Sequence, residues 1–131
     1  LNGAGGDILE RVRAFFEKKT TEAEQRGVNK NRLCFDPGIG FGKTNEENFA
    51  LIANPEKIRV PGTALLMAAS RKRAIGAVCG NPPFEDRMAG TVAAHTASVL
   101  FGADMVRVHD TFEAVQAARV ADAIKQFRKG V

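Results

Sequence analysis

Apolar residues recur along the chain with two different periods, and the alternation between them predicts the order of its elements. Helical spacing in the first segment predicts a helix from about Asp7 to Gln25, with Asp7 as N-cap and Gly27 as the stop signal. Short apolar runs predict three strands, Arg32–Phe35, Ala64–Ala69 and Asp104–Val108. Four later segments have helical patterns: Asn45–Lys57, Lys72–Val78, Glu85–Phe101 and Thr111–Lys129.

The order of these elements predicts an α/β fold, a helix followed by three strand–helix repeats. Such alternation implies parallel strands joined by right-handed crossovers. We expect Ala64–Ala69 to be buried on both faces because it is apolar throughout, and Cys34 to be a small buried side chain. Pro55 is expected to end the second helix. The last helix is expected to bury its larger apolar residues: Val115, Val120, Ile124 and Phe127.

Each predicted strand ends in polar residues at its C-terminal tip, where parallel α/β folds bind their ligands. Asp36 follows the first strand, Ser70-Arg71-Lys72 the second, and Arg107 and His109 the third. Arg107 and His109 alternate across Val108, so both point to the same face, and two donors on one side suit an oxyanion or a phosphate. Scattered solvated charges would not produce this placement, so it indicates a site at one edge of the sheet.

A glycine-rich run, Asp36–Thr44, follows the first strand and contains three glycines that let backbone approach a ligand. The alternative is a turn capped by its own aspartate. Thr44 or Asn45 is a suitable N-cap for the next helix. The segment also resembles the end of a phosphate-binding P-loop, but that motif needs four residues between its first glycine and Gly-Lys-Thr, and only three are present. A P-loop nucleotide binder is therefore disfavoured.

Several side chains keep alternative roles at this point. Lys72 suits a carbonyl, a ring nitrogen or an anion, and equally a solvated first turn of a helix. Arg107 has an alternative as the partner of a carboxylate. His95 lies in an alanine-rich helix, so a packing or surface role is predicted for it. The role of Arg87 stays open.

The composition of the chain is that of one globular domain and argues against nucleic-acid binding and a membrane span. The chain has 131 residues, is 44% hydrophobic and carries a net charge of +4, which bounds it to at most one domain of ordinary globular composition. The positive charge is dispersed and Tyr and Trp are absent, which argues against nucleic-acid binding. No run approaches the ~20 apolar residues of a membrane span, and no secretory signal is visible. Cys34 and Cys79 are not spaced as metal ligands, which favours reduced thiols in a cytoplasm. The start at Leu1, in a glycine-rich segment, is expected for a cut inside a larger protein.

The three strand tips together resemble those of the dihydropteroate synthase family, enzymes of folate biosynthesis with a pterin-binding barrel. The resemblance spans about Asp7 to Ala123, and its motifs occur in the family's order and spacing. These motifs are Asp36–Thr44 followed by Asn48, Ser70-Arg71-Lys72 with Ile75-Gly76, Arg87 with Gly90–Ala94, and Arg107–Asp110. The Ser-Arg-Lys motif separates the chain from the corrinoid-linked methyltransferases of the same superfamily.

The resemblance implies a TIM-type (β/α)8 barrel, of which residues 1–131 would be the C-terminal part of a single domain, three βα units plus a preceding helix. It implies condensation of 4-aminobenzoate with dihydropterin-methyl diphosphate, which releases diphosphate and uses Mg²⁺. The Mg²⁺ ligand is expected in the family's N-terminal half, which this chain lacks, so the chain alone is expected to be inactive. It further implies a homodimer, with a contact through Glu85–Phe101, and an enzyme of a kind that sulfonamides target.

The resemblance also implies a role for each residue at the strand tips. Four would carry the reaction: Asp36 would bind the N–H edge of the pterin, Lys72 its carbonyl and ring-nitrogen side, and Arg107 and His109 the diphosphate. Stabilisation of the leaving diphosphate by positive groups would be the main catalytic contribution.

Four further residues would contact the second substrate. Phe41 and the backbone of Gly40 would line the approach of 4-aminobenzoate, with Ser70 and Arg71 near its carboxylate. The alternative from another class is a non-catalytic fragment or assembly subunit of such an enzyme.

Overall fold

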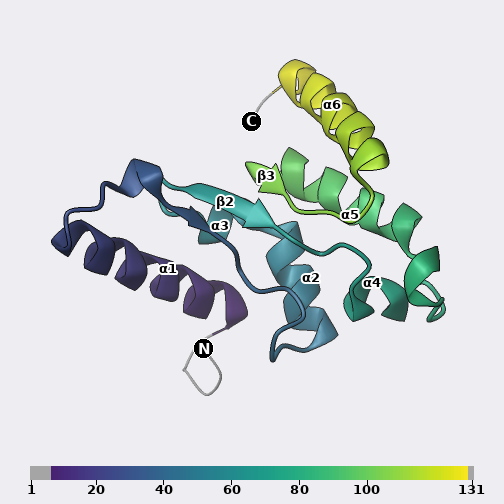
Figure 1. Ribbon diagram of the computed structural model, residues 1–131, viewed down its shortest axis with the longest axis horizontal. Helices are drawn as coiled ribbons and strands as arrows, with labels where there is room; N and C mark the ends of the chain where they lie inside the picture. Colours follow the sequence, from purple (N-terminus) through teal and green to yellow (C-terminus); the bar gives the residue numbers. More distant parts are fainter. Residues whose placement is uncertain (1–6, 130–131) are drawn as a thin grey trace.

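The computed structural model describes residues 7–129, which form six α-helices and a three-stranded parallel sheet (Figure 1). The glycine-rich start of the chain lies outside the described residues. The α-helices are α1 Ile8–Gln25, α2 Asn45–Ala53, α3 Pro55–Ile58, α4 Arg73–Ala77, α5 Met88–Leu100 and α6 Thr111–Phe127. The strands are β1 Cys34–Phe35, β2 Ala64–Met67 and β3 Met105–Val106, and two 3-10 turns lie at Lys30–Arg32 and Phe84–Asp86.

The sheet has the order β1-β2-β3 with both pairs parallel, which confirms the predicted strand–helix alternation. Cys34 pairs with Ala64, and Met67 pairs with Val106. All three strands are shorter than predicted. The second and third strands end earlier than predicted, at Met67 and Val106, so the polar residues that follow them lie in loops.

Burial differs between the two faces of the sheet. Leu65 and Met67 of β2 are buried, whereas Ala64 and Leu66 are half-buried. Cys34 on β1 is exposed. The predictions that β2 is buried on both faces and that Cys34 is buried are therefore wrong for the described chain, because its helices cover only one face of the sheet.

The boundaries of α1 follow the predicted end signals. The Asp7 carboxylate accepts the N–H of Glu10 at 2.9 Å, which satisfies one of the free donors of the first turn. Gly27 has a φ of +83°, and its N–H donates to the Glu24 carbonyl at 3.0 Å. This left-handed glycine ends the helix as the sequence predicts.

Pro55 marks the end of the second helix, as expected, but that helix stops earlier than the predicted Lys57 and Pro55 begins a separate one. The α-helix α2 stops at Ala53, Asn54 breaks it with a φ of −134°, and Pro55 is the first residue of α3. A proline is well tolerated there because the first residue of a helix needs no N–H donor. The helix predicted from Glu85 begins later, at Met88, after a separate 3-10 turn.

The core lies between the helices and the covered face of the sheet. The ring of Phe16 on α1 stacks on Phe35 of β1, with 4.6 Å between ring centres. Leu51 on α2, Ile58 on α3 and Leu65 on β2 are almost fully buried beside them. Burial of such side chains contributes about 1.5–3 kcal/mol each, so this cluster holds the loops at the strand tips in place.

The last helix buries different residues from those predicted. Val115, Val120, Ile124 and Phe127 are all exposed, by 43% to 76%, and Ala121 is the one residue of α6 that is buried. The helix packs on α5 through alanines that line the space between them, Ala114, Ala117 and Ala118. It lies at the opposite end of the molecule from α1 (Figure 1), so its larger apolar residues have no covering element in the described chain.

Candidate functional site

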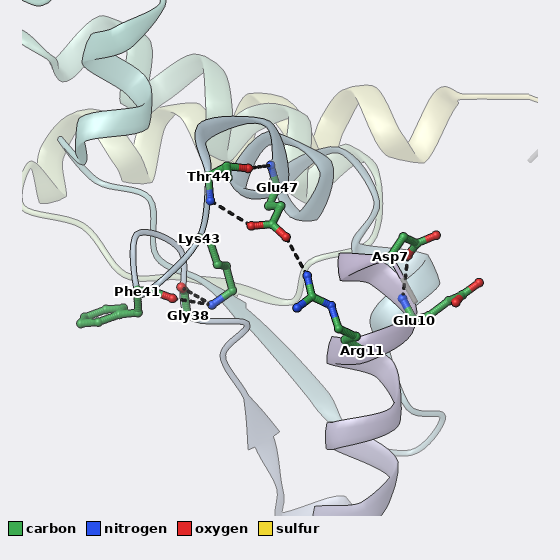
Figure 2. Close-up of polar contacts among 8 residues, drawn as sticks. All are labelled: Asp7, Glu10, Arg11, Gly38, Phe41, Lys43, Thr44 and Glu47. Atoms are coloured by element: carbon green, nitrogen blue, oxygen red, sulfur yellow. Dashed lines mark hydrogen bonds and ion pairs between the residues drawn. The ribbon is translucent and has the colours of Figure 1, made fainter. Parts of the chain in front are cut away.

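The loop after β1 is closed by a lysine that its own sequence supplies (Figure 2). Lys43 Nζ donates to the carbonyls of Gly38 at 2.9 Å and Phe41 at 3.0 Å. The Asp36 carboxylate accepts the N–H of Gly38 at 2.8 Å through one oxygen. The loop is therefore held in one conformation while Asp36 and Phe41 remain exposed.

A capping box anchors the far end of this loop. Thr44 Oγ1 accepts the N–H of Glu47 at 3.1 Å, and Glu47 accepts the N–H of Thr44 at 2.9 Å. The second Glu47 oxygen forms an ion pair of 2.6 Å with Arg11 on α1, as Figure 2 shows. The Thr44 backbone hydrogen bond and Arg11 hold the pKa of Glu47 below its usual value. Of the two predicted N-caps, Thr44 and Asn45, the structure uses Thr44, and its partner Glu47 was not predicted.

Lys72 extends from the tip of β2 over the glycine-rich loop that follows β1. Its Nζ donates to the Ile39 carbonyl and lies 5.1 Å from the centre of the Phe41 ring. Gly40 has a φ of +87°, and a Cβ there would lie 3.3 Å from Lys72 Cδ. The Gly40 N–H donates to Asn48 Oδ1 at 3.0 Å. A glycine is therefore required at this position both for its conformation and for the passage of the lysine.

Two adjacent pockets share Lys72 as a wall. The larger, of about 550 Å³, lies over the glycine loop and the start of α4, and its polar side chains include Lys43, Asn48 and Arg73. The smaller, of about 210 Å³, lies between the tips of β2 and β3. Its lining residues are Ala68, Ser70, Lys72, Arg107, Val108 and His109. The structure thus brings the predicted residues of all three strand tips to the same edge.

The charge distribution at this edge favours an anion. Burial lowers the pKa of Lys72, and the positive charges of Arg107 and Lys43 lower it further, while Asp36 opposes them. Among the described residues no carboxylate forms an ion pair with Arg107, so the alternative of a structural pair finds no support. A ligand with negative charge would be stabilised beside these cations.

His109 is held by the neighbouring strand tip. Ser70 Oγ lies 2.7 Å from His109 Nδ1 and accepts the backbone N–H of His109 at 3.1 Å. Ser70 itself is buried. Because Nδ1 is engaged by Ser70, Nε2 is the ring nitrogen of His109 that can face a ligand. Arg107 and His109 line the same pocket, which confirms their predicted shared face.

Arg71 and Asp36 line neither pocket, unlike the other predicted residues, although the charge of Asp36 acts on Lys72. The Arg71 guanidinium binds Asp110 in a two-pronged ion pair, with distances of 2.6 and 3.0 Å. The Arg71 backbone contacts Thr91 and Arg87 on the next helical segment. Asp110 and Thr91 were missed as candidate residues because nothing in their local sequence shows contacts across 20 to 39 positions.

His95 has the packing role that the sequence left open. It is buried, and its Nε2 accepts the N–H of Ala69 at 3.0 Å just before the Ser70 tip. Burial, and to a lesser degree the charge of Lys72, lower the pKa of His95 to about 4. The histidine is therefore neutral near pH 7 and supports the strand tip from the helix side.

The described residues lack two other kinds of site. Across residues 7–129, none of the helices combines the length and hydrophobicity needed to span a bilayer. The same part of the chain contains no group of three or more His, Cys, Asp or Glu side chains placed to hold a metal ion. Cys34 and Cys79 are both free thiols.

Comparisons with known proteins agree with the strand-tip motifs. The family model described as pterin binding enzyme matches residues 2–109. A dihydropteroate synthase of Synechocystis is 38% identical over 119 residues, which cover 91% of this chain and 41% of that protein. The chain belongs to the pterin binding enzyme family.

Solved structures show the same relationship. A Xanthomonas albilineans dihydropteroate synthase with 4-aminobenzoic acid superposes with a TM-score of 0.88 and 36% identity, over 98% of this chain and 48% of that chain. The same enzyme in complex with 7,8-dihydropteroate gives a TM-score of 0.88 and 36% identity, over 96% and 49%. The chain thus spans about half the length of these enzymes and has the α/β fold of part of their TIM-type barrel.

Proposed function

We propose that the protein is a dihydropteroate synthase, which condenses 4-aminobenzoate with dihydropterin-methyl diphosphate. The observation that carries the proposal is the convergence of Asp36, Lys72, Arg107 and His109 at one sheet edge, in a family member whose relatives carry this name. We further propose that residues 1–131 are the C-terminal part of a single barrel domain. A dihydropteroate synthase needs the remaining strands, because three strands cannot close a barrel.

The pterin ring is proposed to bind between Asp36 and Lys72. One Asp36 oxygen is used by the Gly38 N–H, which leaves the other to accept from the N–H edge of the ring. Lys72 supplies a donor for the carbonyl and ring-nitrogen side. Both groups would hold the ring so that its methylene faces the smaller pocket. This orientation lowers the entropy cost of bringing the reacting groups together.

The diphosphate is proposed to bind at Arg107 and His109. In the reaction the C–O bond between the methylene and the diphosphate breaks, and the diphosphate leaves with the bonding electron pair. The nitrogen of 4-aminobenzoate then forms the new C–N bond and releases a proton. Arg107 and His109 lie beside the leaving group and stabilise the negative charge that develops on it.

The arylamine is proposed to approach over Phe41 and the backbone of Gly40, which line the larger pocket. Sulfonamides carry an arylamine of similar shape, so we propose that they compete at this position. Ser70 and Arg71 were expected near the carboxylate of 4-aminobenzoate. Their side chains are engaged with His109 and Asp110, so a contact to that carboxylate would require them to exchange partners.

The remaining properties concern the whole protein. Magnesium is proposed as its metal, but the described residues do not fit a protein-held Mg²⁺ site, so its ligands would lie outside them and no step above uses the ion. A homodimer contact is proposed at α5, supported by an apolar groove beside it that includes Ala93, Ala97 and Phe101. A cytoplasmic location is proposed because both cysteines are free thiols.

Replacement of Asp36 by Asn tests the function at its most specific residue. The variant keeps the acceptor for Gly38 but presents an NH₂ group to the pterin N–H edge, so a pterin analogue should bind more weakly by ~1.5–3 kcal/mol in calorimetry on the full-length protein. Asp122→Asn, on the exposed side of α6, is the control and should bind normally. A non-catalytic assembly subunit would bind no pterin in any variant, and unchanged affinity in Asp36→Asn would remove the assignment.

A further inference from the structure

Side chains continue the contact between β2 and β3 after the backbone ladder has ended. The last backbone hydrogen bond between the two segments runs from the Arg107 N–H to the Met67 carbonyl, at 3.1 Å. Beyond it, Ser70 holds both the Nδ1 and the backbone N–H of His109. The position of the His109 ring therefore depends on where the chain around Ser70 is held.

The next residue pair is tied more strongly. Arg71 donates from Nε and from its terminal nitrogen to the two oxygens of Asp110, at 3.0 and 2.6 Å. Both side chains are only 19% exposed, and two-pronged pairs of this kind combine charge with a fixed geometry. The Arg71 hydrogen bond holds the pKa of Asp110 below its usual value. Two consecutive residues after β2 thus bind two consecutive residues before α6.

The backbone of Arg71 shows that this position is actively held. Its φ is +57°, a left-handed conformation that costs energy for a residue with a side chain. Its N–H donates to Thr91 Oγ1 at 2.8 Å, and its carbonyl accepts from Arg87 at 3.1 Å. The Thr91 hydroxyl donates in turn to the Arg87 carbonyl at 2.8 Å. Hydrogen bonds to both the N–H and the carbonyl of Arg71 hold it in this unfavourable conformation.

An aromatic ring completes the arrangement. The Arg71 guanidinium lies 5.1 Å from the centre of the Phe84 ring, and the same ring meets the His109 imidazole edge-on, with 5.3 Å between ring centres. Phe84 therefore contacts both Arg71 and His109. Arg71 is packed on one face and paired along one edge.

We propose that Arg71 and Asp110 form a clamp that positions His109 at the anion pocket, and that Arg71 acts as a positioning residue. The inference rests on the proposed function, because it takes the pocket lined by Arg107 and His109 as the diphosphate site. It assigns Asp110 and Thr91, which carry no role in the proposed reaction, to the placement of a group that touches the leaving diphosphate.

The test is calorimetry of inorganic diphosphate binding to the full-length protein. Asp110→Asn weakens the two-pronged pair, and Arg71→Gly removes the side chain while accepting the left-handed backbone. Each should weaken diphosphate binding about tenfold, and the double variant should bind about as weakly as either single variant, since they remove one shared contact. Circular dichroism confirms that each variant is folded, and Thr91→Val, which removes the acceptor of the Arg71 N–H, should act in the same direction.

A matched control uses an ion pair of the same type elsewhere. Arg13 and Glu17 form an exposed pair of 2.6 Å on α1, and Arg13→Gln with Glu17→Gln should leave diphosphate binding within about twofold. Steady-state kinetics add a readout that general destabilisation would not give. The KM for dihydropterin-methyl diphosphate should rise in Asp110→Asn while the KM for 4-aminobenzoate stays within about twofold.

Three outcomes would overturn the clamp. If Arg71→Gly raises only the KM for 4-aminobenzoate and Asp110→Asn does not reproduce the effect, Arg71 is a ligand of that substrate. If folded single variants bind diphosphate as the parent does, His109 is positioned by Ser70 alone. If the parent itself binds no diphosphate, the proposed function fails together with the clamp, and this result is distinct from the other two.

Discussion

The ammonium group of Lys72 lies 5.1 Å from the centre of the Phe41 ring and donates a hydrogen bond to the carbonyl two residues before that ring. One lysine from the tip of β2 therefore fixes the loop that follows β1. The same lysine separates the two pockets at this sheet edge. Its charge can act on a ligand in either pocket, which places it at the centre of the proposed site.

Lys72→Met should remove this charge while it keeps the length of the side chain. We expect a pterin analogue to bind the full-length protein at least about tenfold more weakly, because a hydrogen bond from a charged group contributes ~1.5–3 kcal/mol. Calorimetry measures the change. Lys19→Met, at an exposed lysine that pairs with Glu22 on α1, is the control and should bind as the parent does.

Arg107→Lys tests the anion pocket. A lysine keeps the positive charge but loses the planar fork that matches a phosphate, so the substitution should weaken binding of inorganic diphosphate by about tenfold. Calorimetry on the full-length protein gives this value. Arg119→Lys on the exposed surface of α6 should be silent, and equal weakening by both substitutions would mean that general charge, rather than this position, attracts the anion.

The glycine loop offers a matched pair of substitutions. Gly40 and Gly27 have nearly the same left-handed φ, +87° and +83°, but a Cβ at Gly40 would lie 3.3 Å from Lys72, whereas one at Gly27 meets nothing within 4 Å. Gly27→Ala should lose about 1 kcal/mol of unfolding free energy from backbone strain. Gly40→Ala should lose at least as much and should also weaken pterin binding, as measured by denaturation and calorimetry.

If Gly40→Ala loses stability but binds pterin as the parent does, then Lys72 can shift without consequence for the ligand. Weakened binding in Gly27→Ala would instead show that the loss in Gly40→Ala is not local to the loop.

Stability should depend on pH through His95. Its pKa is lowered from 6.5 to about 4 in the folded state, so the unfolded chain binds more protons below pH 6.5. The unfolding free energy should therefore fall as the pH drops from 6.5 through 4, by about 3 kcal/mol in total, and denaturant titrations at a series of pH values measure it. His95→Gln keeps an acceptor for the Ala69 N–H and should flatten this part of the profile. A profile unchanged by His95→Gln would assign the acid sensitivity to other groups.

The strand tips could be predicted from sequence because each signal is local. Asp36, Lys72 and Arg107 each follow a short apolar run, and the alternation of periods places the runs in one parallel sheet. That combination is enough to bring their side chains to one edge. The boundaries of α1 were predictable for the same reason, since a helix end depends on a few adjacent residues.

What could not be predicted depends on partners far away in the sequence. The pair of Arg71 and Asp110 joins residues 39 positions apart, and either one alone reads as a solvated charge. In α6 the helical period was correct, but Ala121 rather than Val120 or Phe127 is buried, because the neighbouring α5 accepts a face of small residues. A periodic pattern shows which residues share a face and leaves open which neighbour covers it.

The 131 residues alone should not catalyse the reaction, because the near-attack arrangement needs groups from the remainder of the barrel. Purified chain of verified mass, mixed with dihydropterin-methyl diphosphate, Mg²⁺ and 4-aminobenzoate, should give no dihydropteroate above background. Turnover by such a preparation would show that these residues assemble a complete site by themselves, for example between copies of the chain.

The central claim is that this sheet edge is the substrate site of a dihydropteroate synthase. The most direct measurement is product formation by the full-length protein, with dihydropteroate identified by mass and diphosphate release followed in the same reaction. We expect one diphosphate released for each dihydropteroate formed, and loss of both in Lys72→Met. Folded full-length protein that forms no dihydropteroate from saturating substrates and Mg²⁺ would contradict the account, and so would product formation that Lys72→Met leaves unchanged.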